Sequence, residues 1–245
     1  MRLDQALVAR GLARSRTQAA RLIAEGRVLV AGDVAQKPAL AVTDDTQIIA
    51  EPEKWVSRAA YKLLGALEAS GTRLQGRILD AGASTGGFTQ VALESGAELV
   101  YAVDVGHRQL AGLVRADPRV RVREGLNLRE ITLQDLDGQP VDAIVGDVSF
   151  ISLKLLLPSL LDVLQEDGVA LLLVKPQFEV GRRRLGTGGV VNDPRLREEA
   201  VDAVTAVAAS LGWECDWRAP SLLRGASGNQ EFFIRLCAAR SADYP

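Results

Sequence analysis

Hydrophobic and polar positions follow different patterns on the two sides of residue 55. Before it, Ser15 and Gln18 have the spacing of a capping box ahead of an amphipathic helix. Short β-rich runs at 28–30 and 47–49 come after this helix. The first 54 residues are therefore predicted to form a helix pair followed by short strands.

From Ser57 onward, short apolar strands alternate with amphipathic helices. The predicted strands are 77–79, 99–103, 120–122, 143–145, 170–174, 214–217 and 231–236. The predicted helices begin at Ser57, lie around 88–93 and 109–114, and begin again near Ser152 and at Asp193-Pro194. At 100° per residue, Lys62 points away from the apolar stripe of the first of these helices. The alternation is typical of a doubly wound, mostly parallel α/β sheet.

The composition is that of an ordinary globular protein, with 47% hydrophobic and 24% charged residues in 245, which excludes disordered and collagen-like chains. The longest uninterrupted apolar run, 169–174, is far shorter than the roughly 20 residues of a membrane span. The first residues lack the apolar core of an export signal, so we expect a cytoplasmic protein without a membrane partner. Cys215, Cys237 and His107 are too few for a disulfide framework or a two-imidazole metal site, and no metal is expected.

The arginines are unevenly distributed. The first 30 residues hold six arginines against Asp4 and Glu25, a local charge of +4 in a chain of net charge −2. Five of the six are candidate contacts to a nucleic-acid backbone: Arg2, Arg10, Arg14, Arg16 and Arg21. The flexible basic loop 181–189 offers three more and could serve as a lid: Arg182, Arg183 and Arg184. For both segments a solvated basic surface is the alternative.

The sharpest local feature is a glycine-rich turn between the first predicted strand of the sheet and its helix. Its candidate ligand-binding residues are Asp80, Gly82, Ser84, Thr85, Gly86, Gly87 and Phe88. Glycines let a ligand approach the backbone, and the start of the next helix supplies free N–H groups. Asp104 ends the second strand, where an acid can accept both hydroxyls of a ribose. Together they predict a nucleoside-bearing cofactor, and a structural turn with a capping acid is the alternative.

The same turn argues against three other kinds of site. Its spacing is not the dinucleotide G-x-G-x-x-G, and it is not a P-loop because no Lys-Ser/Thr follows. Residues 82–86 match the G-x-S-x-G of hydrolases, but a catalytic triad needs a histidine late in the chain. The single histidine, His107, comes directly after the second strand, so a triad is not expected.

Two charged residues stand at the ends of neighbouring strands. Asp147 follows the fourth predicted strand and Lys175 follows the fifth. The carboxyl ends of strands line the ligand crevice of an open α/β sheet. A lysine that emerges from a dry strand loses part of its hydration, which favours the neutral amine. A strand-end lysine alone is more often part of a structural ion pair, but with Asp147 it forms a candidate acid–base couple.

Five separated motifs resemble one family. They are 55–63 (WVSRAAYKL), 80–88 (DAGASTGGF), 146–150 (GDVSF), 175–179 (KPQFE) and 228–232 (GNQEF). In this order they resemble the FtsJ-type ribose 2′-O-methyltransferases. The whole chain resembles the TlyA family, once called hemolysins and now regarded as ribosomal RNA methyltransferases. Its first 50 or so residues look like the αL RNA-binding motif shared with a small-subunit ribosomal protein.

The resemblance implies a Rossmann-like, seven-stranded methyltransferase sheet preceded by a small α+β RNA-binding domain. The implied boundaries are 1–54 for the RNA-binding domain, 55–58 for a linker and 59–245 for the methyltransferase domain. The implied catalytic tetrad is Lys62, Asp147, Lys175 and Glu231. S-adenosylmethionine is expected on the glycine turn and Asp147, with Asp104 on its ribose and Asn127 near its adenine.

The resemblance also implies the reaction and the substrate. It points to methyl transfer to a ribose 2′-hydroxyl of ribosomal RNA within ribosomal subunits, at a cytidine in 16S and/or 23S rRNA. Lys175 is the candidate base, Asp147 and Lys62 are expected to orient the hydroxyl and hold Lys175, and Glu231 is expected to complete the charge network. Two alternatives are a non-catalytic RNA-binding or ribosome-assembly factor and a membrane-lytic protein.

Overall fold

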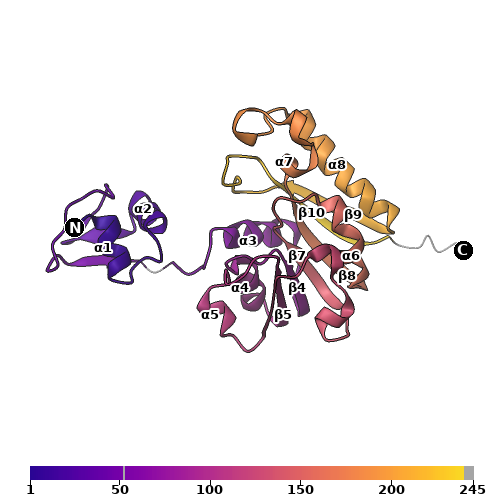
Figure 1. Cartoon of the computed structure of the whole chain (residues 1–245), viewed down its shortest axis with the longest axis horizontal. Coiled ribbons are helices and arrows are strands. Elements are labelled where there is room, and N and C mark those ends of the chain that lie inside the picture. The colour runs from indigo at the N-terminus through magenta and orange to yellow at the C-terminus, as the bar shows by residue number, and fades with distance from the viewer. Residues whose placement is uncertain (52, 240–245) are drawn as a thin grey trace, which may run out of the picture. The chain divides into compact units, whose positions relative to one another are not determined.

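The chain divides into two compact units, Met1–Lys54 and Trp55–Pro245, and each is described by itself (Figure 1). The computed structural model describes residues 1–51 and 53–239. Residue 52 and residues 240–245, which fall within the two predicted domains, lie outside the described residues.

Unit 1 packs two helices against a small antiparallel sheet. Its elements are α1 (Leu3–Ala9), α2 (Arg16–Ala24), β1 (Val28–Val30), β2 (Asp33–Val34) and β3 (Ile48–Ala50), with strand order β2-β1-β3. Ser15 caps α2 by accepting a hydrogen bond from the N–H of Gln18 at 3.2 Å. The predicted capping box is wrong in its second half, because the Gln18 side chain accepts from the N–H of Arg14.

Unit 2 contains one seven-stranded sheet, which confirms the predicted α/β fold. Its strands are β4 (Gly76–Ala81), β5 (Ala97–Asp104), β6 (Val120–Glu124), β7 (Val141–Gly146), β8 (Leu164–Val174), β9 (Trp213–Pro220) and β10 (Phe232–Ala238). Their order is β6-β5-β4-β7-β8-β10-β9. Strands β4 to β8 pair in parallel, whereas β10 is antiparallel to both of its neighbours.

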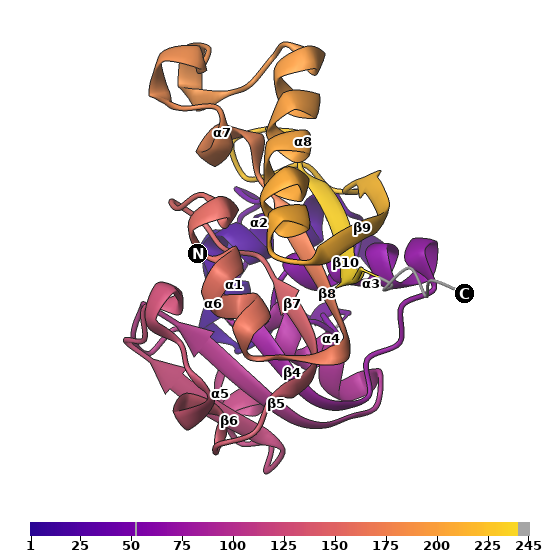
Figure 2. The same cartoon turned by 90° about the vertical axis from the view of Figure 1, so that its right-hand side faces the viewer.

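Helices cover both faces of this sheet (Figure 2). They are α3 (Ala59–Ser70), α4 (Gly87–Glu94), α5 (Gly112–Arg115), α6 (Leu157–Asp162), α7 (Pro176–Glu179) and α8 (Pro194–Ser210). One buried cluster joins the strands to α3, α4 and α5, and a second joins them to α6 and α8. Five short 3₁₀ turns connect these elements: η1 (Leu128–Glu130), η2 (Leu133–Leu136), η3 (Leu153–Leu155), η4 (Arg182–Arg184) and η5 (Thr187–Gly189).

The structure corrects three predicted helix starts. α3 begins at Ala59, and the Ser57 hydroxyl accepts the Ala59 N–H at 3.2 Å from just outside the helix. The helix expected over 109–114 is the single turn of α5. The helix expected from Ser152 is divided into η3 and α6, because Pro158 lies in the first turn of α6 and cannot donate a hydrogen bond to the preceding turn.

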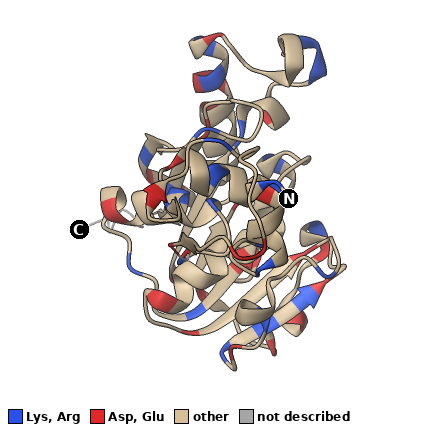
Figure 3. Cartoon of the chain, turned by 90° about the vertical axis from the view of Figure 1, so that its left-hand side faces the viewer, with Lys and Arg blue, Asp and Glu red and all other residues tan. Residues whose placement is uncertain are grey.

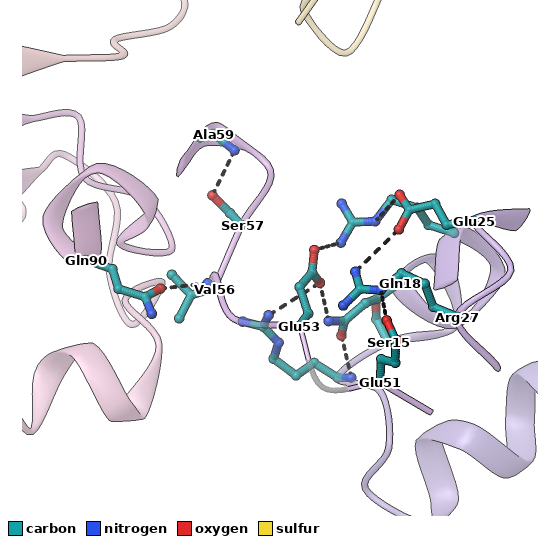
Figure 4. A network of polar contacts seen from close by, with 12 residues as sticks. Ser15, Gln18, Glu25, Arg27, Glu51, Glu53, Val56, Ser57, Ala59 and Gln90 are labelled. Atoms are coloured by element: carbon teal, nitrogen blue, oxygen red, sulfur yellow. Dashed lines mark hydrogen bonds and ion pairs between the residues drawn. The ribbon is translucent and has the colours of Figure 1, made fainter. Parts of the chain in front are cut away.

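The segment predicted as a linker packs at its start with unit 2. Trp55 and Val56 are buried in the cluster formed with α3 and α4. The N–H of Val56 donates to the Gln90 side chain of α4 at 2.8 Å (Figure 4).

Two kinds of feature are absent among the described residues. None of their helices has the length and apolar character needed to cross a membrane. No three His, Cys, Asp or Glu side chains among them are grouped so as to hold a metal ion.

Candidate active site

The candidate site is a cavity at the carboxyl ends of the parallel strands of unit 2. The sheet order reverses between β4 and β7, since β5 and β6 extend the sheet in one direction and β8 extends it in the other. Open α/β sheets bind ligands at such a point because the loops that follow the two strands diverge. The cavity has a volume of about 520 Å³, which suits a small molecule. Loops after β4, β7 and β8 line it, together with the start of α3 and the segment before β10.

Glycines let the turn after β4 pack directly against the end of β7. Gly82 has a φ of +84°, and a Cβ there would lie 3.1 Å from Val148 and 3.3 Å from the carbonyl oxygen of Asp147. Gly86, with a φ of +92°, is the N-cap of α4. The turn therefore delivers the N-terminus of α4 to the cavity, where Gly87 lies in the wall.

Asp80 lies under this turn and is fully buried. Its Oδ2 accepts a hydrogen bond from Thr89 Oγ1 at 2.6 Å, and its Oδ1 has no hydrogen-bond partner among the described residues. Burial raises the pKa of Asp80 to about 7, because the charged carboxylate loses its hydration. A carboxyl group that changes charge near neutral pH therefore lies beneath the glycine turn.

Asp104 and Asn127, the predicted contacts of the cofactor's nucleoside, are not among the residues that line the cavity. Asp104 accepts hydrogen bonds from the N–H groups of Ser84 at 2.8 Å and Gly106 at 2.7 Å, one at each oxygen. It thereby ties the glycine turn to the loop after β5. Each oxygen retains a lone pair for a further donor. Asn127 caps η1 by accepting the N–H of Arg129 at 3.1 Å.

Four charged side chains from four segments meet at the cavity wall. Lys62 Nζ donates to Glu231 Oε2 at 2.6 Å and lies 4.0 Å from Asp147 Oδ2. Asp147 Oδ1 in turn lies 2.7 Å from Lys175 Nζ. Charges alternate along the order Glu231–Lys62–Asp147–Lys175, so each buried charge has an opposite neighbour. We call these four residues the ion-pair cluster.

The fold explains how distant residues reach this cluster. Asp147 and Lys175 directly follow β7 and β8. Glu231 directly precedes β10, and because β10 runs antiparallel its first residue lies beside the end of β8, where Phe232 pairs with Val174. Lys62 comes from α3. A residue off the apolar stripe of a helix is normally exposed, but Lys62 is only 6% exposed in this wall.

Three groups in the cavity wall had no predicted role. Ser149 Oγ accepts a hydrogen bond from Lys175 Nζ at 2.5 Å. The Gln177 amide oxygen is buried without a partner among the described residues. Phe150 is 91% exposed with a φ of +66°, and its ring lies 5.4 Å from that of Phe178. All of them belong to the GDVSF and KPQFE motifs, which were therefore the available signal.

The basic loop after β8 is fastened by a buried asparagine. Arg182–Arg184 lie in the blue segment at the top right of Figure 3, and Arg184 pairs with Glu199 of α8. Asn229 is 1% exposed, accepts the N–H of Val191 at 2.9 Å and donates to the carbonyl of Gly189 at 3.1 Å. One end of the loop is thus fixed to the segment that carries the glutamate of the ion-pair cluster. The sequence alone did not identify Asn229.

In unit 1, the buried Asp4 holds two of the predicted RNA-binding arginines. Arg2 Nε donates to Asp4 Oδ1 at 3.0 Å, and Arg16 Nη2 donates to Asp4 Oδ2 at 2.8 Å. These hydrogen bonds from Arg2 and Arg16 lower the pKa of Asp4 to about 2, since they favour its charged form. The arginine heads remain in solvent, so the acid fixes them without covering them.

Glu53 has the same role at the start of α2 (Figure 4). It pairs with Arg21, accepts from Gln18 Nε2 at 2.5 Å and lies 3.7 Å from Arg14 Nη2. The fifth predicted arginine, Arg10, donates instead to backbone carbonyls, at 2.6 to 2.9 Å. All five arginines therefore have fixed partners within unit 1.

Two families match the chain. The FtsJ-like methyltransferase family matches residues 55–237, and the S4 domain family matches residues 1–48. The S4 match lies wholly within unit 1, and the methyltransferase match spans the ion-pair cluster.

Related proteins match nearly the whole chain. The protein named 16S/23S rRNA (cytidine-2′-O)-methyltransferase TlyA from Mycobacterium tuberculosis is 52% identical over 239 residues, covering 96% of this chain and 89% of its own. Hemolysin A from Brachyspira hyodysenteriae is 37% identical over 238 residues, covering 96% of this chain and 99% of its own. A solved structure of a hemolysin-named protein from Streptococcus thermophilus is 38% identical to this chain and matches it with a TM-score of 0.77. It covers 98% of this chain and 89% of its own.

Proposed function

The chain belongs to the FtsJ-like methyltransferase family, and from this premise we propose that it methylates a ribose 2′-hydroxyl of ribosomal RNA, with S-adenosylmethionine as donor. The observation that carries the proposal is the ion-pair cluster in the wall of the cavity beside the glycine turn. The name of the Mycobacterium tuberculosis relative points to cytidine in 16S and 23S rRNA as the target. We infer that the reaction takes place in the cytoplasm, because its proposed substrate is ribosomal RNA.

The residues around the glycine turn fit S-adenosylmethionine. Gly82 keeps the backbone close to the end of β7, where a side chain would contact Val148. Asp80 has a buried carboxyl oxygen without a donor, and Asp104 retains lone pairs for hydroxyl groups. Such a set suits a ligand with cationic and hydroxyl donors. When bound, S-adenosylmethionine supplies a methyl group that is already activated as a sulfonium.

The chemistry left to the protein is to align the RNA hydroxyl and remove its proton. We assign proton removal to Lys175, whose amine lies at the cavity wall and must be neutral when the RNA binds. Asp147 holds this amine at 2.7 Å, and Lys62 in turn lies 4.0 Å from Asp147. Glu231 balances the charge of Lys62, so the cluster carries two positive and two negative charges.

RNA binding is assigned to the arginines of unit 1 and of η4. Exposed guanidinium groups contact phosphates and release counterions, which supplies affinity without selecting a sequence. The exposed ring of Phe150 at the cavity offers a surface on which an unstacked base can lie. We infer that rRNA in ribosomal subunits is the partner.

The test is transfer of tritiated methyl from S-adenosylmethionine to separated, unmodified small and large ribosomal subunits, followed by mapping of 2′-O-methylated nucleotides. We expect label at a cytidine ribose with the unsubstituted chain and with Lys154→Ala, and none with Lys62→Ala or Glu231→Gln. Label on a base or on protein, or no label at all, would contradict the proposal. A lytic or purely RNA-binding protein would transfer no methyl group with any of these chains.

A further inference from the structure

Lys175 has a side-chain partner outside the ion-pair cluster, the hydroxyl group of Ser149. We propose that Ser149 is a positioning residue that directs the Lys175 amine toward the RNA hydroxyl. This inference rests on the proposed function, because it assumes that Lys175 removes the proton. It adds a residue from the loop after β7 to the machinery of proton transfer.

The contacts of the amine differ in direction. Lys175 Nζ lies 2.7 Å from Asp147 Oδ1, but that oxygen has no aligned hydrogen bond with any described group. The backbone oxygen of Asp147 is 3.5 Å away, at the limit of a hydrogen bond. Ser149 Oγ, at 2.5 Å, is the one aligned side-chain acceptor of this amine among the described residues. The ion pair with Asp147 attracts the Lys175 amine, whereas the hydrogen bond to Ser149 fixes the direction of one of its N–H groups.

Direction matters because lysine is a flexible residue with a compact charge. Its four-carbon stem places the amine only as well as the partners of the amine allow. Lys62 is held by an aligned hydrogen bond to Glu231 at 2.6 Å, so its position does not depend on a hydroxyl group. Lys175 forms an ion pair with Asp147 but has no aligned hydrogen bond to a carboxylate among the described residues. Misplacement of a reacting group by about 1 Å can cost on the order of 10²-fold in rate.

A hydroxyl group also suits a residue that changes its proton count during the reaction. An ammonium group only donates hydrogen bonds, whereas a neutral amine can also accept one. The neutral amine keeps two N–H donors, for which Ser149 Oγ and the Asp147 oxygens are acceptors, so its lone pair stays free to take the proton of the RNA hydroxyl. The hydrogen bond from Lys175 to Ser149 can therefore persist before and after proton transfer.

The loop places Ser149 on the open side of the lysine. Ser149 is exposed in the cavity wall, whereas Lys175 is 8% exposed behind it. The next residue, Phe150, has a φ of +66°, a strained left-handed conformation that non-glycine residues rarely adopt. This turn directly follows the serine in the same wall. Strain of this kind is retained where a precise backbone path is needed.

The test compares single-turnover methyl transfer by Ser149→Ala, Ser149→Thr and the unsubstituted chain, at saturating S-adenosylmethionine and ribosomal subunits. We expect Ser149→Ala to lower the rate by about 10- to 100-fold, with unchanged dissociation constants for both ligands. Ser149→Thr keeps the hydroxyl and should restore the rate to within about threefold. Ser210→Ala, in the last turn of α8, is the control for loss of a serine hydroxyl elsewhere.

Any of three results would overturn the role of Ser149. The first is a Ser149→Ala chain as fast as the unsubstituted one, and the second is a Ser149→Thr chain as slow as Ser149→Ala. The third is a loss expressed only as weaker RNA binding. The proposed function has its own test, since it fails if the unsubstituted chain transfers no methyl group to ribosomal RNA.

Discussion

The ion-pair cluster of unit 2 and the arginine surface of unit 1 both alternate cations with anions, but they bury different members. In the cluster, both lysines and both carboxylates are withdrawn from solvent. In unit 1 the two acids that hold arginines are buried, since the side chains of Asp4 and Glu53 are 6% and 4% exposed, whereas the Arg16 side chain is 58% exposed. Burial of both the lysines and the carboxylates suits a site that positions one reacting atom. Burial of the acid alone leaves the cations accessible to phosphates.

This difference separates rate from affinity. Charges in a low-dielectric wall interact strongly and are screened little by salt, whereas exposed arginines act through a field that salt weakens. Changes in the cluster should therefore alter the methyl-transfer step with little effect on RNA affinity. Changes in unit 1 should alter RNA affinity and its salt dependence, with little effect on the rate at saturation.

The largest effect is expected from Lys175→Ala. Loss of the base should lower the single-turnover rate by about 10² to 10⁴-fold, while the dissociation constants of S-adenosylmethionine and RNA stay within about twofold. Quench-flow assays and filter binding measure these quantities. Lys154→Ala removes a partly exposed lysine of the same unit and serves as the control. A parallel fall in RNA affinity would show that rate and affinity are not controlled by separate regions.

Asp80 and Asp4 sharpen the comparison because their pKa values move in opposite directions, to about 7 and about 2. Folded Asp80 keeps its proton up to about pH 7, whereas in the unfolded chain it loses it near pH 3.8. Its stabilising contribution is full below pH 3.8 and is lost as the pH rises through 7. The resulting change in the free energy of unfolding is on the order of 4 kcal/mol, at about 1.4 kcal/mol for each unit by which the pKa is raised.

Urea unfolding at pH 5 and pH 8 measures this dependence, and tryptophan fluorescence reports unit 2 alone because Trp55, Trp213 and Trp217 all lie there. Asp80→Asn should remove most of the loss of stability between pH 5 and pH 8. Asp167→Asn, at an exposed site, should leave that loss unchanged. An equal pH slope in the unsubstituted and Asp80→Asn chains would refute the assignment. For Asp4 the sign is reversed: its contribution is present above pH 3.8 and is lost as the pH falls through 2.

Deleting residues 1–54 is expected to weaken RNA binding by on the order of 10²-fold at low salt. The plot of log affinity against log salt should become flatter, because fewer phosphate contacts release fewer counterions. Binding is measured at four or more salt concentrations with an rRNA fragment, and circular dichroism checks that unit 2 stays folded. Equal slopes with and without the segment would show that unit 1 does not anchor the RNA.

The smallest effect, Asp4→Asn, has the most informative sign. Simple electrostatics predicts tighter RNA binding when an acid is removed from a basic surface. If Asp4 holds Arg2 and Arg16 in place, the loss of their common anchor should weaken binding instead, by about two- to fivefold. Asp33→Asn, an exposed acid of unit 1, should show only the electrostatic gain. Tighter binding by Asp4→Asn would mean that the arginines need no anchor.

Local patterns were enough to predict the elements whose signals lie within a few residues. The alternation of strands and helices predicted the sheet, and Asp193-Pro194 begins α8 as cap and first turn. Where other nearby residues decide the local structure, the prediction was wrong. The side chain of Gln18 bonds to Arg14 instead of Ser15, and Pro158 divides a helix that periodicity had joined.

The site shows the same limit more strongly. The resemblance named the four charged residues, but only the antiparallel course of β10 explains how Glu231 comes within 2.6 Å of Lys62. The partners Asp4 and Glu53 could not be chosen from sequence, because Asp4 lies 12 positions from Arg16 and Glu53 lies 32 positions from Arg21. Ser149 lay in a recognised motif, yet its contact with Lys175 depends on the pairing of β7 with β8.

The late position of β10 in the chain also has a consequence for the order in which the site is assembled. Lys62 and Glu231 are 169 positions apart, so a chain emerging from its own synthesis presents the cation long before its closest anion. Until then Asp147, at 4.0 Å, is the one member of the ion-pair cluster that offers Lys62 an opposite charge, and a lysine with incomplete counter-charge is costly to bury. The strand that completes the sheet, β10, thus also brings Glu231 to Lys62 in the wall of the cavity.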